Sequence, residues 1–274
     1  MQKATYDSAI SPFAPDRMLA ALWARRELIG TLALRDIRAR YRQSILGVYW
    51  TILNPLAMAA VYTVVFSLIA QVPVGNVPYG AFVFCGLVPW SFFSNGLTNA
   101  TNSLVGMAGL LTKVAFPREV LPLAAVLARL VDLLVSLGVL LVIIAWYRLP
   151  LGWTALLLPI PILVELVFLL GLGFFLSAAN LFYRDVGQLL AVALSLWIFV
   201  TPVVYPLDRV PPGLRPVILL NPMTPVVSSF QDLLLNGRLP ASGPLLGAAT
   251  ISLMTLVLGY LAFKWLEPLF AETV

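Results

Sequence analysis

The chain has 274 residues, of which 61% are hydrophobic and 11% are charged, and its formal net charge is +5. Soluble globular chains average about 45–50% apolar and about 25% charged residues, so this composition excludes an ordinary soluble domain and indicates an integral membrane protein. The single cysteine excludes a disulfide framework, and the absence of histidine excludes histidine-based catalysis and histidine metal ligands. We expect no catalytic residue, no bound metal and no nucleic-acid partner.

Residues 1–45 are expected to form a cytoplasmic segment that contains an amphipathic helix lying on the membrane. Eight Lys and Arg residues are scattered through the first 46 positions without a continuous apolar run, so a cleavable secretory signal is not expected. Arg35, Arg38 and Arg42 share a helical face beside an apolar one, a pattern typical of helices at an anionic membrane surface. The apolar positions at helical spacing are Met18, Leu19, Leu22, Trp23, Ile29, Leu34, Ile37 and Tyr41. The alternative is that this segment is only the positively charged flank of the first span.

Residues 46–274 are expected to form an all-α integral membrane domain with six transmembrane helices. Between Arg42 and Lys113 there is no charged residue, and this stretch is long enough for two spans of about 20 residues each. Turn residues and charges divide the remaining apolar sequence, as at Tyr147 to Pro150 after the third span. The six expected spans are 46–71, 79–103, 120–146, 154–182, 186–205 and 243–266.

The distribution of basic residues predicts the orientation of the spans. With six spans, 12 of the 17 Lys and Arg residues fall on one side of the membrane and four on the other, while Arg129 lies inside a span. Because cytoplasmic loops carry the excess of Lys and Arg, both termini are expected in the cytoplasm.

The segment 104–118, between the second and third spans, is short, half apolar and tipped with charge. A helix over Leu104 to Leu111 would gather apolar side chains on one side, Lys113 and Arg118 would face water, and Pro117 would lead into the next span. An apolar knob at the cytoplasmic face suits the grip of a partner protein, although an interfacial helix without a partner fits equally well. The residues expected to form this contact are Leu110, Leu111, Lys113, Phe116, Pro117, Arg118 and Glu119.

Three ionisable residues are predicted within spans, namely Arg129, Asp132 and Glu165. Such groups are costly in lipid and usually face a bundle interior or a water-filled cavity. Arg129 and Asp132 are three residues apart on one helix and can therefore pair. The functional interpretation is a polar path or a proton relay. The alternative is a structural pair that fixes helix packing, with Glu165 as its partner or as a stray polar group near water.

Aromatic residues make up 11% of the chain, and several are predicted inside spans. Trp90 and Trp197 fall near the middles of their spans, where an interfacial aromatic belt does not explain them. Flat, weakly polar rings would let sugar rings slide past without holding them tightly, whereas the alternative is ordinary packing. The candidate path residues are Tyr62, Trp90, Phe93, Trp197 and Tyr205.

The longest predicted extracytoplasmic segment, 206–242, is rich in proline yet apolar. Thr224-Pro225 looks like an N-cap followed by proline at the first helical position, and Asn236-Gly237 looks like the matching stop. A helix over 224–236 and a second one over 211–220 are too short to span, so we expect two re-entrant or interfacial helices that cap the bundle. An ordinary external loop is the alternative.

Six short motifs follow one another along the chain. They are Arg35-Asp-Ile-Arg-Ala-Arg-Tyr-Arg-Gln-Ser-Ile-Leu-Gly, Gly86-Leu-Val-Pro-Trp-Ser-Phe-Phe, Lys113-Val-Ala-Phe-Pro-Arg-Glu, Asn180-Leu-Phe-Tyr-Arg-Asp, Thr201-Pro-Val-Val-Tyr-Pro and Asn221-Pro-Met-Thr-Pro. Each is weak alone, but in this order and spacing they cover about 35–236. Together they resemble the permease subunit of ATP-binding-cassette polysaccharide exporters, which export O-antigen, capsule or teichoic acid chains.

The resemblance implies a homodimer with one channel between two copies, in the bacterial inner membrane. It also implies a separate cytoplasmic ATP-binding-cassette ATPase dimer that docks on 104–118 and the N-terminal helix. The substrate would be a lipid-linked glycan fed from the cytoplasmic leaflet, with the helices of 206–242 as an exit gate. No cofactor is expected on this chain. It contains neither GxxxxGK[ST] nor GxGxxG, so ATP and Mg would be bound by the partner ATPase.

Other function classes stay open at this point. One is an ATP-driven exporter of a small molecule or drug. Another is a proton-coupled secondary transporter that uses Asp132 and Glu165. An intramembrane enzyme is disfavoured, because the chain lacks histidine and no acid pair is obviously matched across two helices.

Overall fold

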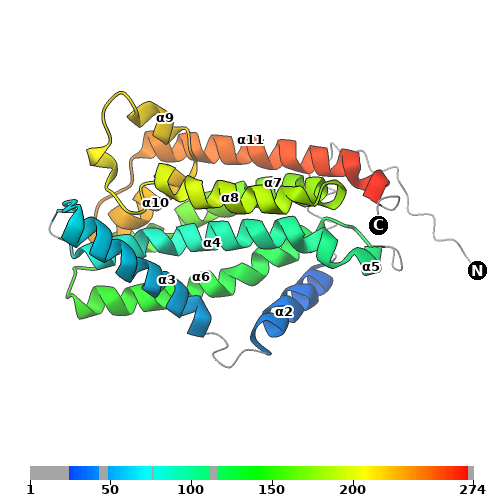
Figure 1. Ribbon diagram of the computed structural model, residues 1–274, viewed down its shortest axis with the longest axis horizontal. Coiled ribbons are helices and arrows are strands. Elements are labelled where there is room, and N and C mark those ends of the chain that lie inside the picture. Colours follow the sequence, from blue (N-terminus) through cyan, green and yellow to red (C-terminus); the bar gives the residue numbers. More distant parts are fainter. Residues whose placement is uncertain (1–24, 43–48, 76, 112–115, 271–274) are drawn as a thin grey trace, which may run out of the picture.

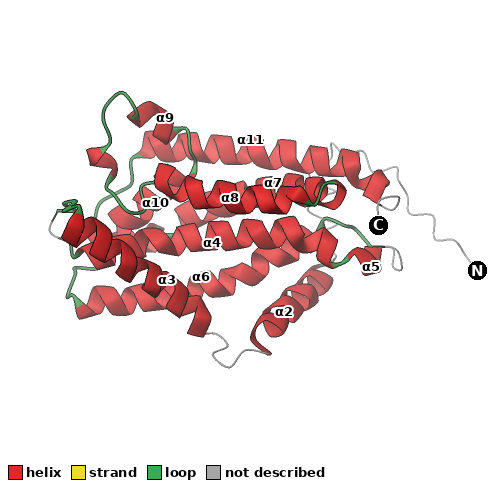
Figure 2. Cartoon of the chain, viewed as in Figure 1, coloured by secondary structure: helices red, strands yellow, loops and turns green. Residues whose placement is uncertain are grey.

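The computed structural model describes residues 25–42, 49–75, 77–111 and 116–270, and these residues form helices and no strand (Figures 1 and 2). The α-helices are α2 Arg26–Arg42, α3 Tyr49–Tyr62, α4 Tyr79–Gly106, α5 Ala108–Leu111, α6 Val120–Trp146, α7 Pro159–Phe182, α8 Asp185–Val200, α9 Arg215–Leu219, α10 Met223–Gln231 and α11 Ser242–Leu266. Shorter π or 3-10 segments are η1 Thr63–Ile69, η2 Trp153–Leu157, η3 Leu207–Arg209, η4 Asp232–Asn236 and η5 Glu267–Leu269.

Five helical segments of the described chain are long and apolar enough to cross a membrane. They are Tyr49–Ile69, Tyr79–Gly106, Val120–Trp146, Trp153–Phe182 and Ser242–Leu269. The all-helical, multi-span class predicted from composition is therefore confirmed. The expected span 186–205 corresponds to α8, whose 16 helical residues extend only about 24 Å, less than the roughly 30 Å of a hydrocarbon core. A sixth complete span stays a prediction.

The centre of the bundle is α4. It packs against α3, α6, α7, α8 and α10, and 78% of its most apolar 18-residue window is buried inside the protein. The other four spanning segments are only 11–33% buried by the same measure. Figure 1 shows α4 running between α6 and α8, with α3 lying obliquely across the half of the bundle nearer to α10. The features of α4 therefore decide what the interior of the bundle looks like.

The closest helix pair is α7 with α11. A methyl group built on Gly259 would lie 2.0 Å from the carbonyl oxygen of Gly171, and one built on Gly171 would lie 2.5 Å from the backbone nitrogen of Leu256. Ala248 and Ser252 continue the buried small-residue side of α11. Small residues let two helix backbones touch, which is the usual way that apolar helices pack tightly in membranes.

Different short elements close the two ends of the bundle (Figure 1). At one end lie α2, α5 and the end of α11, and at the other lie α9 and α10. The first end has its own buried cluster, in which Ile29 and Leu32 of α2 pack with Leu104, Leu121 and neighbouring residues. Part of the predicted apolar stripe of α2 thus covers protein rather than lipid, while Leu34 is exposed. That α2 lies on the membrane stays a prediction, and residues 18–23 of the expected helix lie outside the described residues.

The helices of segment 206–242 exist, but their bounds and burial differ from expectation. α9 is short and has no buried residue. α10 begins at Met223, before the predicted Thr224 cap, because the Oδ1 of Asn221 accepts a hydrogen bond from the backbone nitrogen of Met223 at 3.1 Å. The helix continues through η4 and ends at Gly237, whose φ of +61° is the left-handed conformation expected at this stop. Since α10 packs on α4, α7 and α11, it is enclosed by protein, and its re-entry into the membrane stays a prediction.

The end of α6 illustrates how local sequence stops a helix. α6 ends at Trp146, as expected, and Arg148 adopts a left-handed φ of +54°. The backbone nitrogen of Leu149 then bonds to the carbonyl of Ile144 at 3.0 Å, which satisfies one of the last free carbonyls of the helix. Pro150 follows and prevents the helix from resuming.

Candidate functional site

The exposed side of α4 is polar, although α4 is a spanning helix. The exposed residues of α4 are Asn95, Thr98, Asn102 and Gly106, and none has an apolar side chain. Their spacing of three and four residues puts them on one face, and half-exposed Ser91 lies one turn before them. A row of amides and hydroxyls facing hydrocarbon would be costly, so this face lines a wet groove or a protein contact. We call Ser91, Asn95, Thr98 and Asn102 the polar stripe.

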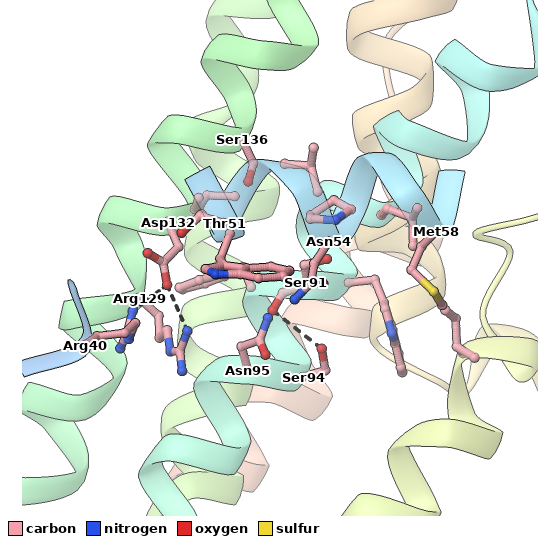
Figure 3. Close-up of a pocket in the computed structure, with 18 residues that line it drawn as sticks. Arg40, Thr51, Asn54, Met58, Ser91, Ser94, Asn95, Arg129, Asp132 and Ser136 are labelled. Carbon is pink, nitrogen blue, oxygen red and sulfur yellow. Dashed lines mark hydrogen bonds and ion pairs between the residues drawn. The ribbon is translucent and has the colours of Figure 1, made fainter. Parts of the chain in front are cut away.

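A cavity of about 480 Å³ opens beside the first turns of the polar stripe. Figure 3 shows its labelled side chains, with Thr51, Asn54 and Met58 coming from α3 and Ser91, Ser94 and Asn95 from α4. Asp132 and Ser136 of α6 and Arg40 of α2 complete the polar lining, and Trp50 and Trp90 add flat walls. Ile198 of α8 also lines the cavity, which is therefore a chamber of mixed polar and apolar lining between five helices.

An ion-pair cluster lies at the edge of this chamber. The Oδ2 of Asp132 accepts a hydrogen bond from Arg129 at 2.9 Å, as the i, i+3 spacing predicts, and a second from Nη1 of Arg40 at 2.6 Å (Figure 3). Arg129 also donates to the Oδ1 of Asn99 on α4 at 2.8 Å. Asp132 thus joins α6 to α2, and Arg129 joins α6 to α4, which fits the structural role that was one of the two alternatives. The connection to Arg40 spans 92 residues, so local spacing could not reveal it.

Glu165 is separate from this cluster. Its side chain is completely buried in α7, and neither carboxylate oxygen has a hydrogen-bond partner in the described part of the chain. Glu165 is therefore not the partner of Arg129 or Asp132, which the structural alternative had allowed, and it is not near water. Asp132 is held by two guanidinium groups at the chamber, whereas Glu165 is enclosed by protein, and a role of these acids in proton transfer stays a prediction.

The candidate aromatic residues fall into two groups. Trp90, Phe93 and Trp197 pack together with Phe168, with Phe93 stacked on Phe168 at 5.5 Å and edge-on to Trp197 at 5.3 Å. Phe93 is fully buried, so it contacts no substrate in this conformation, whereas Trp90 reaches the chamber wall. Tyr62 packs on Phe66 at 6.1 Å, and the hydroxyl of Tyr205 donates to the carbonyl of Phe199 at 3.0 Å. Their roles on a substrate path stay predictions.

The segment predicted to be a cytoplasmic knob is only partly described. Its helix is a single turn, α5, and α4 extends to Gly106 before it. Lys113 lies outside the described residues, as do the side chains of Leu110 and Leu111. Their contribution to a contact with a partner stays a prediction.

Residues 116–119, which we call the elbow, fold inward rather than into water. The guanidinium of Arg118, expected to face water, donates to the backbone carbonyl of Glu267 and lies 5.6 Å over the ring of Phe270. Pro117 is buried and Phe116 packs on the cluster at this end of the bundle. The prediction for Arg118 was wrong because η5 and Phe270, about 150 residues later in the chain, return to cover the elbow.

An ion pair strengthens the contact between the elbow and the end of α11. The Nζ of Lys264 donates to Oε2 of Glu119 and to Oε2 of Glu267, both at 2.9 Å. The side chain of Glu119 is 8% exposed and that of Lys264 is 21% exposed, so the carboxylate is enclosed while the ammonium group still reaches solvent. The elbow is therefore joined directly to the end of α11.

At the opposite end, several of the quoted motifs meet. The Nδ2 of Asn221 donates to the hydroxyl of Thr201 at 2.9 Å, and the Nε2 of Gln231 donates to the carbonyl of Pro202 at 3.2 Å. The hydroxyl of Tyr79 donates to the carbonyl of Val204, and a methyl group on Gly86 would lie 3.0 Å from the carbonyl oxygen of Val203. The turn after α8 is therefore fastened to α4 and α10.

Asp232 lies at this end, outside the spanning helices. Burial raises the pKa of its carboxyl group, and the hydrogen bond that Asn236 donates to it at 3.1 Å partly offsets this rise. The carboxyl group is thus poised to lose its charge more easily than an exposed aspartate.

The sequence that forms these features matches a protein-family model. The model described as ABC-2 type transporter matches residues 27–235, which include the chamber, the polar stripe, the elbow and the fastened turn. The chain belongs to the ABC-2 type transporter family. Its members are membrane subunits of ABC transporters, so the chain is a multi-span permease subunit that works with an ATPase partner.

Named relatives extend over most of the chain. An O-antigen export system permease protein, RfbA, from Myxococcus xanthus is 35% identical over 261 residues, which is 94% of this chain and 99% of the relative. A protein of the same name from Klebsiella pneumoniae is 31% identical over 250 residues, covering 90% and 94% of the two chains. The polysialic acid transport protein KpsM from Escherichia coli is 24% identical over 253 residues, covering 87% and 93%.

Two features of the site were missed by reading the sequence. The polar stripe could have been predicted, because its polar residues recur at helical spacing in an otherwise apolar span. They are Ser91, Asn95, Thr98 and Asn102. The pairs Arg40–Asp132 and Lys264–Glu119 carried no local signal, since each joins residues that are far apart in the sequence.

Proposed function

We propose that this chain is the membrane-spanning subunit of an ATP-driven exporter that moves a lipid-linked, O-antigen-like polysaccharide from the cytoplasm across the bacterial inner membrane. The family and the names of the relatives support this proposal. The observation that carries it is the polar stripe, because a spanning helix with only polar side chains on its exposed face suits a hydrated path for a polar polymer.

In this proposal two copies of the chain form one channel. The polar stripe of each copy would face the other across a shared wet lumen, with Trp90 at its wall and Tyr62, Trp197 and Tyr205 nearby along the path. A single copy leaves the stripe open on one side, and exposing amides to lipid would be unfavourable. The end that contains α9 and α10 would act as the exit gate.

The energy for transport would come from a cytoplasmic ATP-binding-cassette ATPase dimer that binds ATP and Mg. It would dock on segment 104–118 beside α2, with both termini of the chain in the cytoplasm. The elbow would pass its movement to α4, α6 and α11, because Arg118 and Glu119 contact the end of α11. The apolar residues Leu110 and Leu111 would supply the grip.

Docking is tested by the double substitution Leu110→Asp and Leu111→Asp. We expect the variant to insert normally but to lose the ATPase during co-purification, since two charges would replace the apolar contact. The matched control is Leu214→Asp, which changes an exposed leucine near α9 at the other end of the molecule. Normal co-purification of the double variant would contradict the docking site.

The hydrated path is tested by cysteine labelling in membranes. Thr98→Cys and Asn102→Cys should react with a water-soluble maleimide, whereas Val61→Cys on the exposed apolar side of α3 should not. The native Cys85 is completely buried, so it should not react with the maleimide and need not be replaced. Equal protection of all three introduced cysteines would contradict a hydrated groove along α4.

Export itself is tested in a strain that lacks its own O-antigen permease. The chain, expressed together with its ATPase, should restore surface polysaccharide. A purified permease that moved its cargo in liposomes without any ATPase would overturn the proposal.

A further inference from the structure

Helix α8 runs beside the polar stripe and borders it at both ends. At the start of α8, a methyl group built on Gly187 would lie 3.5 Å from the Oδ1 of Asn102, the last residue of the stripe. Near the end of α8, Ile198 lines the chamber together with Ser91, the first residue of the stripe. Figure 1 shows the two helices next to each other, and they are in contact. The position of α8 therefore sets one border of the polar stripe.

The apolar contacts of α8 are confined to a narrow line. Its buried residues are Leu190, Leu194 and Ile198, which recur every four residues on one side of the helix. Apolar contact is non-directional, so one such line fixes the rotation of a helix poorly. Toward the end of α8, Trp197 adds a ring contact with Phe93, whereas residues 185–196 contain no aromatic residue. The start of α8 therefore depends more on directional hydrogen bonds than its end does.

The side chain of Asn180 supplies such bonds at the start of α8. Asn180 belongs to the last turn of α7 and is 3% exposed. Its Oδ1 accepts a hydrogen bond from the backbone nitrogen of Gly187 at 2.9 Å. Its Nδ2 donates to the carbonyl of Thr101 and to the Oδ1 of Asn102, both at 3.2 Å. One buried amide therefore joins α7, α8 and α4.

The surroundings of this amide determine its orientation. A backbone N–H can only donate, so Gly187 requires the carbonyl oxygen of Asn180 on its side and directs the NH2 group toward α4. Asn102 accepts one of these N–H groups, and its own Nδ2 donates to the carbonyl of Thr98 at 2.9 Å. The oxygen and the nitrogen of the last amide in the polar stripe are thus both held along α4.

We propose that Asn180 is a positioning residue for transport. Its amide joins the start of α8 to α4 and holds Asn102 in place, so the polar stripe keeps its border at the end of the bundle where α5 lies. Asn180 is itself enclosed and acts on the path through α8 and Asn102. Its importance for export rests on the proposed function, but the joining of α8 to α4 does not.

The competing explanation is that Asn180 only closes the turn between α7 and α8. An aspartate at this position keeps an acceptor for the backbone nitrogen of Gly187 but has no N–H group for Thr101 and Asn102. A leucine has neither the acceptor nor the donors. Asn180→Asp therefore separates a junction with α4 from a turn that involves α7 and α8 alone.

The test measures how readily the start of α8 separates from the bundle. Leu190→Cys places a thiol on the buried line of α8, and its reaction with a water-soluble maleimide is followed in the purified full-length chain, where Cys85 is completely buried. We expect Asn180→Leu and Asn180→Asp each to speed this reaction by about tenfold, because each removes both hydrogen bonds to α4. Size-exclusion profiles check that each variant is folded.

Two further variants serve as the control and as the milder change. Asn221→Leu removes an amide that donates to Thr201 at the other end of α8, and it should leave the reaction of Leu190→Cys unchanged. Asn102→Ala alters an exposed position and should fold even if the Asn180 variants do not. We expect about threefold faster reaction in Asn102→Ala, since the bond from Asn180 to Thr101 remains.

The rates decide between the two explanations. A native rate in Asn180→Asp, with a faster one in Asn180→Leu, would reduce Asn180 to a turn residue and overturn the junction with α4. A native rate in both would overturn any role in holding α8, and a native rate in Asn102→Ala would overturn the contribution of Asn102. An equal increase in Asn221→Leu would show general loosening and would also overturn the proposal.

The role in transport is measured in the reconstituted complex with its ATPase. Export per ATP hydrolysed should fall in Asn180→Asp while ATP hydrolysis continues, because the path and not the ATPase is altered. An unchanged ratio together with faster labelling would overturn the role in transport. Since labelling needs neither an ATPase nor a glycan, a native complex that exported nothing would refute the proposed function and leave the labelling result intact.

Discussion

Two spanning segments that follow each other in sequence differ sharply in burial. The first consists of α3 and η1, and the second is α4. The most apolar window of α4 is 78% buried with a mean hydropathy of 1.3, whereas that of Tyr49–Ile69 is 11% buried with a mean hydropathy of 2.0. The most enclosed of the five spanning segments is therefore the least hydrophobic. Mean hydropathy in this protein reflects contact with lipid rather than burial in the protein, because only lipid-facing positions must be apolar.

The largest expected effect concerns packing. Leu97→Ala in α4 removes a completely buried side chain and should lower the free energy of unfolding by about 2–5 kcal/mol. Leu68→Ala in η1 changes a side chain that is 69% exposed and should change it little. Unfolding in mixed micelles with increasing denaturing detergent measures both. An equal loss at Leu68 would mean that another surface, such as a second copy, covers the first span.

A charge placed on the exposed side of each helix should give the next largest effect. Val61→Asp on α3 would put a carboxylate into hydrocarbon, at a cost of about 2.5–3.5 kcal/mol for insertion at a helix centre. Thr98→Asp would put the same group on the polar stripe, where water can solvate it. The yield of membrane-inserted protein should fall for Val61→Asp only, and a similar fall for Thr98→Asp would remove the distinction between the two faces.

Removing a single hydrogen bond should also cost more stability in α4 than in η1, but the difference should be smaller. Tyr79→Phe in α4 removes a bond to the carbonyl of Val204, far away in sequence, and should cost about 1 kcal/mol. Thr63→Val in η1 removes only a bond to Ala59 one turn earlier, and should cost close to nothing. Thermal unfolding of the detergent-solubilised variants compares them, and equal midpoints would show that the turn after α8 is held by other contacts.

The smallest expected effect on stability comes from the ion pair between α11 and the elbow. Its effect on transport should be larger. Lys264→Gln removes a partly exposed ion pair with Glu119 and should cost no more than about 1 kcal/mol. If the elbow transmits movement, export per ATP hydrolysed should nevertheless fall. Reconstituted complexes measure the ratio, with Arg184→Gln as the control. An unchanged ratio would limit the role of Lys264 to packing.

Local sequence predicted most helices because the signals for them are local. Apolar runs ended by turns placed α6 at 120–146 and α11 within a residue of its bounds, and Asn236-Gly237 marked the end of η4. The Arg129–Asp132 pair was predictable for the same reason. The pairs Arg40–Asp132 and Lys264–Glu119 and the contact of Arg118 with Glu267 were not, because each joins segments about 90 to 150 residues apart whose proximity depends on the whole bundle. Neither was the full burial of Phe93, since burial depends on which faces of neighbouring helices meet.

The crossing of Gly171 and Gly259 limits which parts of the molecule can move. With backbone atoms this close at the crossing, α7 and α11 have little room for small shifts along each other. The two helices are therefore expected to move together as one rigid pair. In the channel proposed above, widening would then come from movement of α3 and α8, which pack less extensively on the rest of the bundle, while α7 and α11 stay together.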